Sequence, residues 1–526
     1  MGWFMSKIVL TEKDAKNKLL NGVRTLTDAV KITLGPKGRN VVLDVGTEPL
    51  ITNDGVTIAK HITFEDKAEN LGANVIKNAC IKTNDVAGDG TTTATLLTYS
   101  LFSEGLKYTE MGANPIFLRV GINKAIDFVV NEMKKHVVIV EDYNAIKQVA
   151  TISSASNLVG ELIAEGYKKV GFNGTIVAED GVGTNSSLEV VEGVRLPHGF
   201  LSPYMCVNGG SVAECDNPYV LVTDKRITNA NDVLPIMEQV AKVNGCLVII
   251  ADDVDGDALN TIVVNDVRKS FNCLCVKAPF YAERKADALK DLALILNANL
   301  ISGSVYNNLT NLTLQDLGSC KKIRADKNTT TILGASYDKQ KVAERIEELK
   351  TKKSQTVGYE KECLEQRINM LTGAVAIIKV GANSEIELKE NKLRIEDAIN
   401  ATSSAIEEGV IAGGGTAFVK VKMALEEFAN TLVGDEKLGA IVVKTALDCV
   451  LKQIAKNAGV DEEKVLNIVA ENADFNYGYN ALNNTFCNMV ESGIIDPFKV
   501  TRTALITAGS VAATLLTTEC VVADKE

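Results

Sequence analysis

The sequence has few aromatic residues and an excess of acidic ones. Phe, Trp and Tyr make up 5% of the 526 residues, and the formal net charge is −11 at pH 7. Proteins that bind single-stranded nucleic acid stack its bases on aromatic side chains, and proteins that bind a duplex neutralise its phosphates with a positive patch. We therefore expect no nucleic-acid partner.

Histidine is scarce, and the cysteines are dispersed. The three histidines, His61, His136 and His198, are far apart, so a histidine-based zinc or iron site is disfavoured and any metal should have oxygen ligands. The eleven cysteines run from Cys80 to Cys520 without a Cys-x-x-Cys pair. This pattern favours a reducing compartment, and we expect a cytoplasmic protein.

Long apolar runs and the common phosphate-binding loop are also missing. No stretch approaches 18 uncharged apolar residues, and the first ten residues contain no apolar run of signal-peptide length. We therefore expect no membrane partner. The pattern Gly-x-x-x-x-Gly-Lys-Ser/Thr does not occur, so any phosphate site must be of another kind.

The sequence predicts helices at both ends of the chain. Apolar residues at Val23, Leu26 and Val30 predict an amphipathic helix that stops at Gly35-Pro36, and residues 40–43 predict a short strand. Another helix is expected after Gly90, and helical patterns continue to about residue 135. Ala-, Val- and Leu-rich helical sequence returns after residue 390.

The middle of the chain has a different pattern. Residues 246–250 and 273–276 are short apolar runs separated by a helical stretch near 258–267, as in parallel βαβ units. Charged helical sequence follows at 339–371. The sequence thus predicts a multidomain α+β protein of about three domains, in which an α/β domain is inserted into a mainly α-helical one.

Residues 84–93, Asn-Asp-Val-Ala-Gly-Asp-Gly-Thr-Thr-Thr, form a Gly-rich turn that opens onto a helix. A helix N-terminus offers unpaired N–H groups to a phosphate, and Asp89 supplies the oxygen ligand that Mg²⁺ prefers. An ordinary capped helix start has the same residue types, and the local sequence leaves both readings open.

Three more glycine-containing segments could converge on the same site. They are residues 33–39, 52–55 and 412–415. Each alone is more typical of an ordinary turn or a tight helix connection.

Taken together and in this order, these segments resemble the group I chaperonins, the bacterial and organellar Hsp60 family. The similarity extends from about Lys18 to Asp524 and includes residues 34–43, 88–95, 199–204, 394–415, 476–480 and 496–497. The resemblance implies an ATP-dependent chaperone that binds non-native polypeptides and promotes their folding inside a ring cavity.

The resemblance also implies a domain organisation. A mainly α-helical equatorial ATP-binding domain would comprise residues 1–135 and 408–526, a small α/β intermediate hinge domain 136–191 and 376–407, and an α/β apical polypeptide-binding domain 192–375. Subunits would form a homo-oligomeric seven-membered ring, as one ring or two, and a co-chaperonin lid is a possible partner.

By position, the resemblance implies an ATP site and its catalytic groups. ATP would lie near Thr33, Leu34, Gly35, Pro36, Asn53, Asp89, Gly90, Thr91, Thr92, Thr93, Ile152, Ser153, Gly414, Asn480, Ala481 and Asp496. Asp89 would hold Mg²⁺, and backbone oxygens near Thr33 and Asn53 would hold K⁺. Asp397 would orient the attacking water, with Asp54 nearby, since positioning and charge neutralisation drive phosphoryl transfer.

In the predicted apical domain, the resemblance implies a face that binds polypeptides. Its residues would be Phe200, Tyr204, Met205, Leu234, Met237, Leu259, Val263 and Val264. Leu259 and Val263 are four residues apart and can share one helix face. Periodicity alone does not distinguish such an exposed stripe from ordinary buried core.

Some positions depart from the usual family pattern. Asn53 replaces a common lysine, and Ala374 follows Gly373 where the family often has two glycines at a hinge. His198 stands where an arginine commonly pairs across subunits with a glutamate, here Glu385. A histidine is mostly neutral at pH 7, so we expect a weaker and more pH-sensitive pair.

Two other classes of function remain open. The chain could be a scaffold that holds clients without hydrolysis, although retention of Asp54, Asp89 and Asp397 argues against this. It could also be a small-molecule kinase or phosphatase with an unusual phosphate loop, which would predict one defined substrate and no ring.

Overall fold

A computed structural model describes residues 7–45, 49–172, 174–181, 183–206, 212–279, 283–303, 309–335, 337–354 and 359–524. The chain forms two compact units. Unit 1 comprises Met1–Glu165, Ala178–Ser187 and Ile378–Glu526, and unit 2 comprises Gly166–Val177 and Leu188–Ile377. The predicted α+β class, with a central α/β segment inserted between helical ends, is confirmed. The three-domain boundaries stay a prediction.

Unit 1 is mainly helical. Its helices are α1 (Glu12–Val30), α2 (Gly55–His61), α3 (Lys67–Ala87), α4 (Thr91–Glu110), α5 (Pro115–Lys134), α6 (Tyr143–Ser154), α13 (Glu385–Glu408), α14 (Thr416–Lys420), α15 (Lys422–Ala429), α16 (Gly434–Ala446), α17 (Cys449–Asn457), α18 (Glu462–Glu471) and α19 (Phe498–Leu516). Its strands are β1 (Lys7–Thr11), β2 (Val41–Asp44), β3 (Pro49–Thr52), β16 (Val410–Ala412), β17 (Tyr477–Asn480), β18 (Thr485–Asn488), β19 (Ile495–Pro497) and β20 (Cys520–Asp524).

The helices predicted at the N-terminal end are confirmed. In α1 the side chains of Val23, Leu26 and Val30 are buried, and a 3₁₀ turn at Lys31–Thr33 follows before Gly35. Helix α4 begins directly after Gly90, whose φ of 85° lies in the left-handed region that favours glycine. The apolar period of 3.6 residues therefore identified the buried faces correctly.

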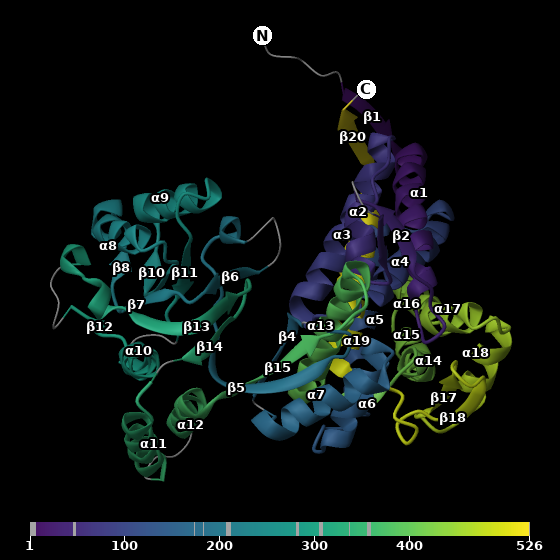
Figure 1. The fold of residues 1–526 in the computed structure, drawn as a ribbon. Coiled ribbons are helices and arrows are strands. Elements are labelled where there is room, and N and C mark those ends of the chain that lie inside the picture. Colours follow the sequence, from purple (N-terminus) through teal and green to yellow (C-terminus); the bar gives the residue numbers. More distant parts are fainter. Residues whose placement is uncertain are drawn as a thin grey trace. The chain divides into compact units, whose positions relative to one another are not determined.

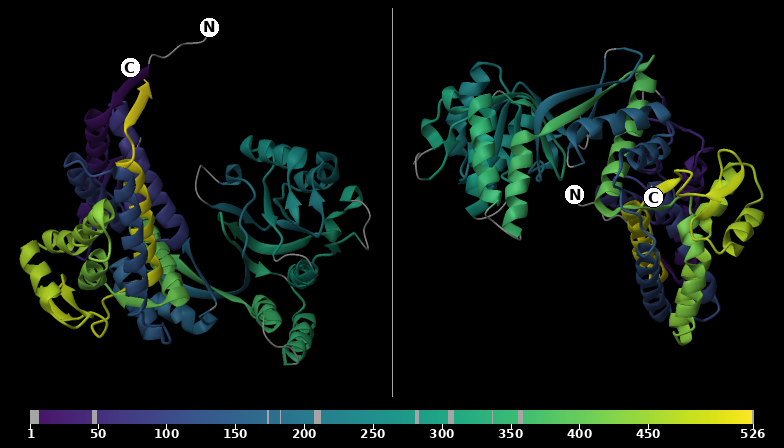
Figure 2. Two further views of the ribbon diagram at one scale, coloured as in Figure 1. Left: turned by 180° about the vertical axis from the view of Figure 1, so that it is seen from behind. Right: turned by 90° about the horizontal axis from the view of Figure 1, so that it is seen from below.

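The core of unit 1 is built from both ends of the chain. Helix α19 packs on α4 and α5, and α16 also packs on α5 (Figure 1). Strands β1 and β20 pair antiparallel, with Lys7 opposite Asp524, and run side by side in each view (Figures 1 and 2). The N- and C-terminal segments thus fold as one body, although these two strands were not predicted.

Unit 2 is an α/β fold. Its strands are β6 (Ala213–Asp216), β7 (Tyr219–Thr223), β8 (Arg226–Ile227), β9 (Leu247–Ala251), β10 (Asp253–Val254), β11 (Cys273–Lys277), β12 (Leu300–Ile301), β13 (Gly318–Ala325) and β14 (Thr330–Ala335), and its helices are α8 (Ala230–Lys242), α9 (Gly256–Val267), α10 (Glu283–Leu296), α11 (Lys339–Ser354) and α12 (Tyr359–Thr372). Four elements lie where the chain passes between the units: α7 (Asn157–Val170), β4 (Thr175–Asp180), β5 (Ser187–Leu196) and β15 (Ala374–Val380).

The predicted βαβ unit is confirmed. Strands β9 and β11 are parallel, with Leu247 opposite Cys273, and α9 connects them. The sheet continues in the order β11-β9-β7-β13-β14-β5. Helices α8 and α9 cover one side of this sheet and α10 lies on the other (Figure 1), which explains why β9 is buried along its whole length.

A buried ion cluster attaches two charged helices to α10. Asp291 of α10 has a fully buried side chain that accepts hydrogen bonds from Arg345 Nε at 2.8 Å and Arg367 Nε at 2.7 Å. Arg345 lies on α11 and Arg367 on α12. The charged sequence at 339–371 therefore forms two helices that pack on each other and are anchored by one carboxylate (Figure 2).

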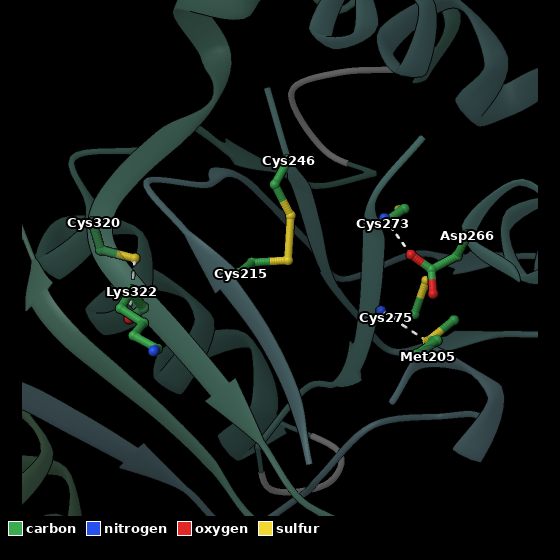
Figure 3. Close-up of a disulfide and its surroundings, with 8 residues drawn as sticks. All are labelled: Met205, Cys215, Cys246, Asp266, Cys273, Cys275, Cys320 and Lys322. Atoms are coloured by element: carbon green, nitrogen blue, oxygen red, sulfur yellow. Dashed lines mark hydrogen bonds between the residues drawn. A yellow bond between two sulfur atoms is a disulfide. The ribbon is translucent and has the colours of Figure 1, made fainter. Parts of the chain in front are cut away.

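A disulfide joins Cys215 of β6 to Cys246, the residue before β9 (Figure 3). The other nine cysteines are free. Figure 3 also shows Asp266 beside Cys273, and Met205 Sδ accepting a hydrogen bond from the backbone N–H of Cys275 at 3.4 Å. The pairing was not foreseen from the sequence, because 31 residues separate the two cysteines and only the fold brings them together.

Within the described ranges, no helix is long and apolar enough to cross a membrane.

Replacing the anchoring carboxylate tests the ion cluster. We expect Asp291→Ala to destabilise unit 2 by about 3–5 kcal/mol, because it leaves two guanidinium groups without their buried partner. Asp287→Ala is the matched control: its side chain is 43% exposed where it pairs with Arg367, and it should cost about 1 kcal/mol or less. Hydrogen exchange of α11 and α12 measures both variants, and equal protection in the two would contradict the anchoring role.

Candidate functional site

A cavity of about 730 Å³ lies within unit 1. Every residue that the family resemblance links to ATP or to catalysis lines it: Thr33, Leu34, Gly35, Pro36, Asn53, Asp54, Asp89, Gly90, Thr91, Thr92, Thr93, Ile152, Ser153, Asp397, Gly414, Asn480, Ala481 and Asp496. Segments more than 400 residues apart in the sequence therefore meet at one place.

One wall of the cavity is the N-terminus of α4. The backbone N–H groups at the start of this 20-residue helix have no partner within the helix and carry the positive end of its dipole. The wall is closely packed, because a Cβ added at Gly55 would lie 2.7 Å from the hydroxyls of both Thr91 and Thr92. A negatively charged group is the ligand that such a surface favours.

Asn457, which the sequence analysis did not predict as a site residue, supports the loop at residues 33–36. Asn457 Nδ2 donates hydrogen bonds to the carbonyl oxygens of Lys31, at 3.0 Å, and Leu34, at 2.9 Å. No local pattern around Asn457 signals this role, since it lies at the end of a helix more than 400 residues further along the chain.

Three aspartates of the cavity have raised pKa values. Burial is the main cause for Asp89, Asp397 and Asp496, and the charges of neighbouring aspartates add to it. The pKa of Asp496 rises to about 6, through burial and the charge of Asp89, and the pKa of Asp397 is raised well above its usual range. Ionisation of these carboxyl groups is therefore unfavourable unless a ligand compensates their charge.

Hydrogen bonds orient the carboxylates of Asp54, Asp89 and Asp496. Asp89 accepts from Ser153 Oγ at 3.2 Å, and Asp496 accepts from the backbone N–H of Gly414 at 3.1 Å. Asp54 caps α2 and accepts from the N–H groups of Val56, at 3.1 Å, and Thr57, at 2.8 Å. The scaffold itself thus positions these three carboxylates.

This donor set fits a hard divalent cation bound together with phosphates. Crowded carboxylates are relieved by a cation, and Mg²⁺ takes oxygen ligands. Across the described residues, no group of three or more His, Cys, Asp or Glu side chains could hold a metal alone. Mg²⁺ commonly binds through one or two carboxylates plus substrate phosphates, so this arrangement suits it.

Further lining residues were not predicted. They include Gln148, Arg394 and Ile494. Arg394 precedes Asp397 by three residues on α13, and this helical spacing was a signal in the sequence that could have placed it at the site.

The predicted polypeptide-binding residues of unit 2 differ in exposure. Tyr204 is 70% exposed and Val264 is 45% exposed, and Phe200, Leu234, Leu259 and Val263 are half-buried. Met205 and Met237 are buried in the core, so the prediction that these two belong to an accessible face is wrong for this structure. They fill the space between the sheet and its covering elements.

The expectation that His198 is neutral at pH 7 agrees with its surroundings. Burial, and the nearby charge of Lys277, lower the pKa of the imidazole. Its pairing with Glu385 of another subunit stays a prediction.

Comparison of the sequence with models of known protein families identifies the family of this chain. The model of the TCP-1/cpn60 chaperonin family matches residues 26–526. The chain belongs to this family. Among solved structures, it is similar to the chaperonin gp146 from the bacteriophage EL 2 (Pseudomonas aeruginosa), crystallised in the presence of ATP-BeFx. The two share 22% sequence identity and a TM-score of 0.72, over 99% of this chain and 100% of that one, and this likeness shows the fold.

The raised pKa of Asp496 predicts a pH-dependent cost in the free chaperonin. Its folded-state pKa of about 6 lies above the ordinary value of 3.8, so stability falls as pH rises from about 4 to 6, and the full cost is present above pH 6. We expect Asp496→Asn to raise the stability of unit 1 at pH 8 by an amount on the order of 1–3 kcal/mol, and by roughly half as much at pH 5, where the folded state is protonated but the unfolded state is still ionised.

Urea denaturation at both pH values, without nucleotide or Mg²⁺, measures this difference. Asp127→Asn is the control, because Asp127 is exposed on α5. A gain that is the same at pH 5 and pH 8 would contradict the electrostatic explanation.

Proposed function

We propose that this chaperonin is an ATPase that couples ATP binding and hydrolysis in the unit 1 cavity to the binding and folding of non-native polypeptides. The observation that carries the proposal is the meeting of four carboxylates, Asp54, Asp89, Asp397 and Asp496, with the N-terminus of α4 in one cavity. The N-terminus of a helix favours a bound anion, and clustered carboxylates favour a bound cation. A Mg²⁺–nucleotide complex supplies both.

In this proposal each group has a defined task. The N–H groups and hydroxyls of Thr91, Thr92 and Thr93 would bind phosphate oxygens, and Asp89 would hold Mg²⁺, which neutralises phosphate charge when bound. Backbone oxygens of Thr33 and Asn53 would hold K⁺. Asp397 would orient the attacking water, with Asp54 beside it.

The similar phage chaperonin supports the nucleotide assignment, since gp146 was crystallised in the presence of ATP-BeFx. A holding scaffold without hydrolysis is the alternative outcome. The raised pKa of Asp397 favours the catalytic reading, because a carboxylate with a raised pKa is a better proton acceptor when ionised.

Polypeptide clients would bind unit 2 at its accessible apolar residues. Tyr204 and Val264 are exposed, and Leu259 and Val263 are half-buried on the same helix as Val264. We further propose a homo-oligomeric ring of seven subunits, as one ring or two, with a co-chaperonin lid as a possible partner. This assembly follows the family resemblance.

A cytoplasmic, reducing location is also proposed. It is supported by the nine free cysteines and predicts that Cys215 and Cys246 are thiols in the cell, because the cytosol keeps most protein thiols reduced. Trapping thiols at lysis with an alkylating agent, followed by denaturation and mass measurement, should then give eleven modified cysteines. Nine would show that the disulfide persists and would contradict this location.

Hydrolysis is tested by steady-state ATP turnover of the purified full-length assembly, sized by light scattering. We expect Asp397→Asn to lower kcat by about 100-fold or more while ATP still binds, because water positioning is lost but the phosphate contacts remain.

Asp461→Asn is a suitable control, since Asp461 is an N-cap at the surface and lies outside the cavity residues. A wild-type assembly that binds unfolded protein without hydrolysing ATP would support the scaffold alternative. A monomer that turns over one small substrate would contradict the chaperone function.

A further inference from the structure

One cationic side chain of the cavity has an unused hydrogen-bond donor. Arg394 lies on α13, three residues before Asp397, and both line the cavity. Residues at this spacing lie on the same face of a helix. The guanidinium group is therefore carried on the side of α13 that faces the candidate nucleotide site.

The guanidinium is held at one end only. Its Nη2 donates to Glu390 Oε1 at 2.8 Å, whereas its Nε is buried and has no hydrogen-bond partner. A buried N–H without a partner costs free energy, so such groups are rare unless a ligand or water completes them. Because Nε is buried, it can gain a partner only if the side chain reorients toward an acceptor in the cavity.

The charge balance of the cavity identifies the kind of acceptor. Its described lining contains the carboxylates of Asp54, Asp89, Asp397 and Asp496 but, as cationic side chains, only Lys147 and Arg394. Lys147 Nζ is already bonded to Glu161 Oε1 at 2.8 Å. A bound triphosphate would add about four negative charges, and of these two cations Arg394 is the one with a buried N–H that lacks a partner.

Glu390 connects this arginine to the nucleotide loop. The same Oε1 that accepts from Arg394 also accepts from Asn40 Nδ2, at 3.3 Å. Asn40 follows directly on the segment 33–39. The arginine is thus oriented by a residue next to the loop that lines the cavity, which limits the positions its planar fork can take.

We propose that Arg394 is a catalytic residue whose guanidinium group reorients when ATP binds, donates to the γ-phosphate and stabilises the charge that develops on it. The inference rests on the proposed ATPase function. In the step, the water oxygen forms a bond to the γ-phosphorus, and the bond from phosphorus to the bridging oxygen breaks. The electron pair leaves with ADP, and the proton of the water passes through Asp397 to the released phosphate.

The test compares Arg394→Gln and Arg394→Lys with the wild type, as assembled full-length protein. We expect Arg394→Gln to lower kcat by about 100-fold and Arg394→Lys by about tenfold, because lysine keeps the charge but not the fork. The dissociation constant of ADP should change by less than about twofold, since ADP has no γ-phosphate, whereas the dissociation constant of beryllium fluoride for the ADP-bound assembly should rise by about tenfold or more, because beryllium fluoride takes the place of the γ-phosphate.

Lys392→Gln is the matched control. Lys392 is a cation of the same helix that pairs with Asp180 at 2.9 Å and does not line the cavity, so its kcat should stay within twofold of the wild type. Low millimolar guanidinium should partly restore turnover in Arg394→Gln if the missing group acts at the phosphate.

The outcomes separate this inference from the function on which it rests. A wild-type assembly without ATP turnover would refute the proposed function itself. Wild-type turnover with unchanged kcat in Arg394→Gln, or equal weakening of ADP binding and of beryllium fluoride binding, would refute the role of Arg394 alone. If Arg394→Gln does not assemble, the comparison of kcat between Arg394→Lys and Lys392→Gln decides the question.

Discussion

The crowding of carboxylates in the unit 1 cavity is the constraint on which the rest of the site depends. Burial raises the pKa values of Asp89, Asp397 and Asp496, and the charges of Asp54 and Asp89 add to the effect, so the folded chain carries an electrostatic cost when nothing compensates these groups. Any ligand that relieves this repulsion binds the folded state and stabilises it by mass action. The stability of unit 1 and the occupancy of its cavity are therefore linked.

The scaffold withstands this cost because both chain ends contribute to one packed core. Strand β16 pairs with β19 so that Ile411 lies opposite Asp496, and this pairing sets the Gly413–Gly415 turn against the Asp496 carboxylate. The packing of α19 on α4 brings the end of the chain to the threonines at the start of α4. Distant segments are thus held together by backbone pairing and apolar packing rather than by the charged groups themselves.

Local sequence patterns predicted the elements but not their long-range partners. The apolar period predicted α1 and α4, and the short apolar runs at 246–250 and 273–276 predicted a parallel βαβ unit. These elements could be predicted because they depend on residues that are close in the sequence. The support from Asn457, the Cys215–Cys246 bond and the burial of Met205 depend on which elements meet in space. The list of cavity residues came from family resemblance, since each turn alone was ambiguous.

The buried face of α13 fixes the rotation of this helix, and therefore the backbone positions of Arg394 and Asp397 relative to each other. Ile395, Ala398, Ala401 and Ala405 are buried in the contact with α6 and α19. At Gly88 a Cβ would lie 2.3 Å from the Cβ of Asn400, so glycine there permits close approach of α13 to the phosphate turn. Because residues 394 and 397 are presented by this one rigid helix, any displacement of α13 would move the cationic donor and the acidic group together.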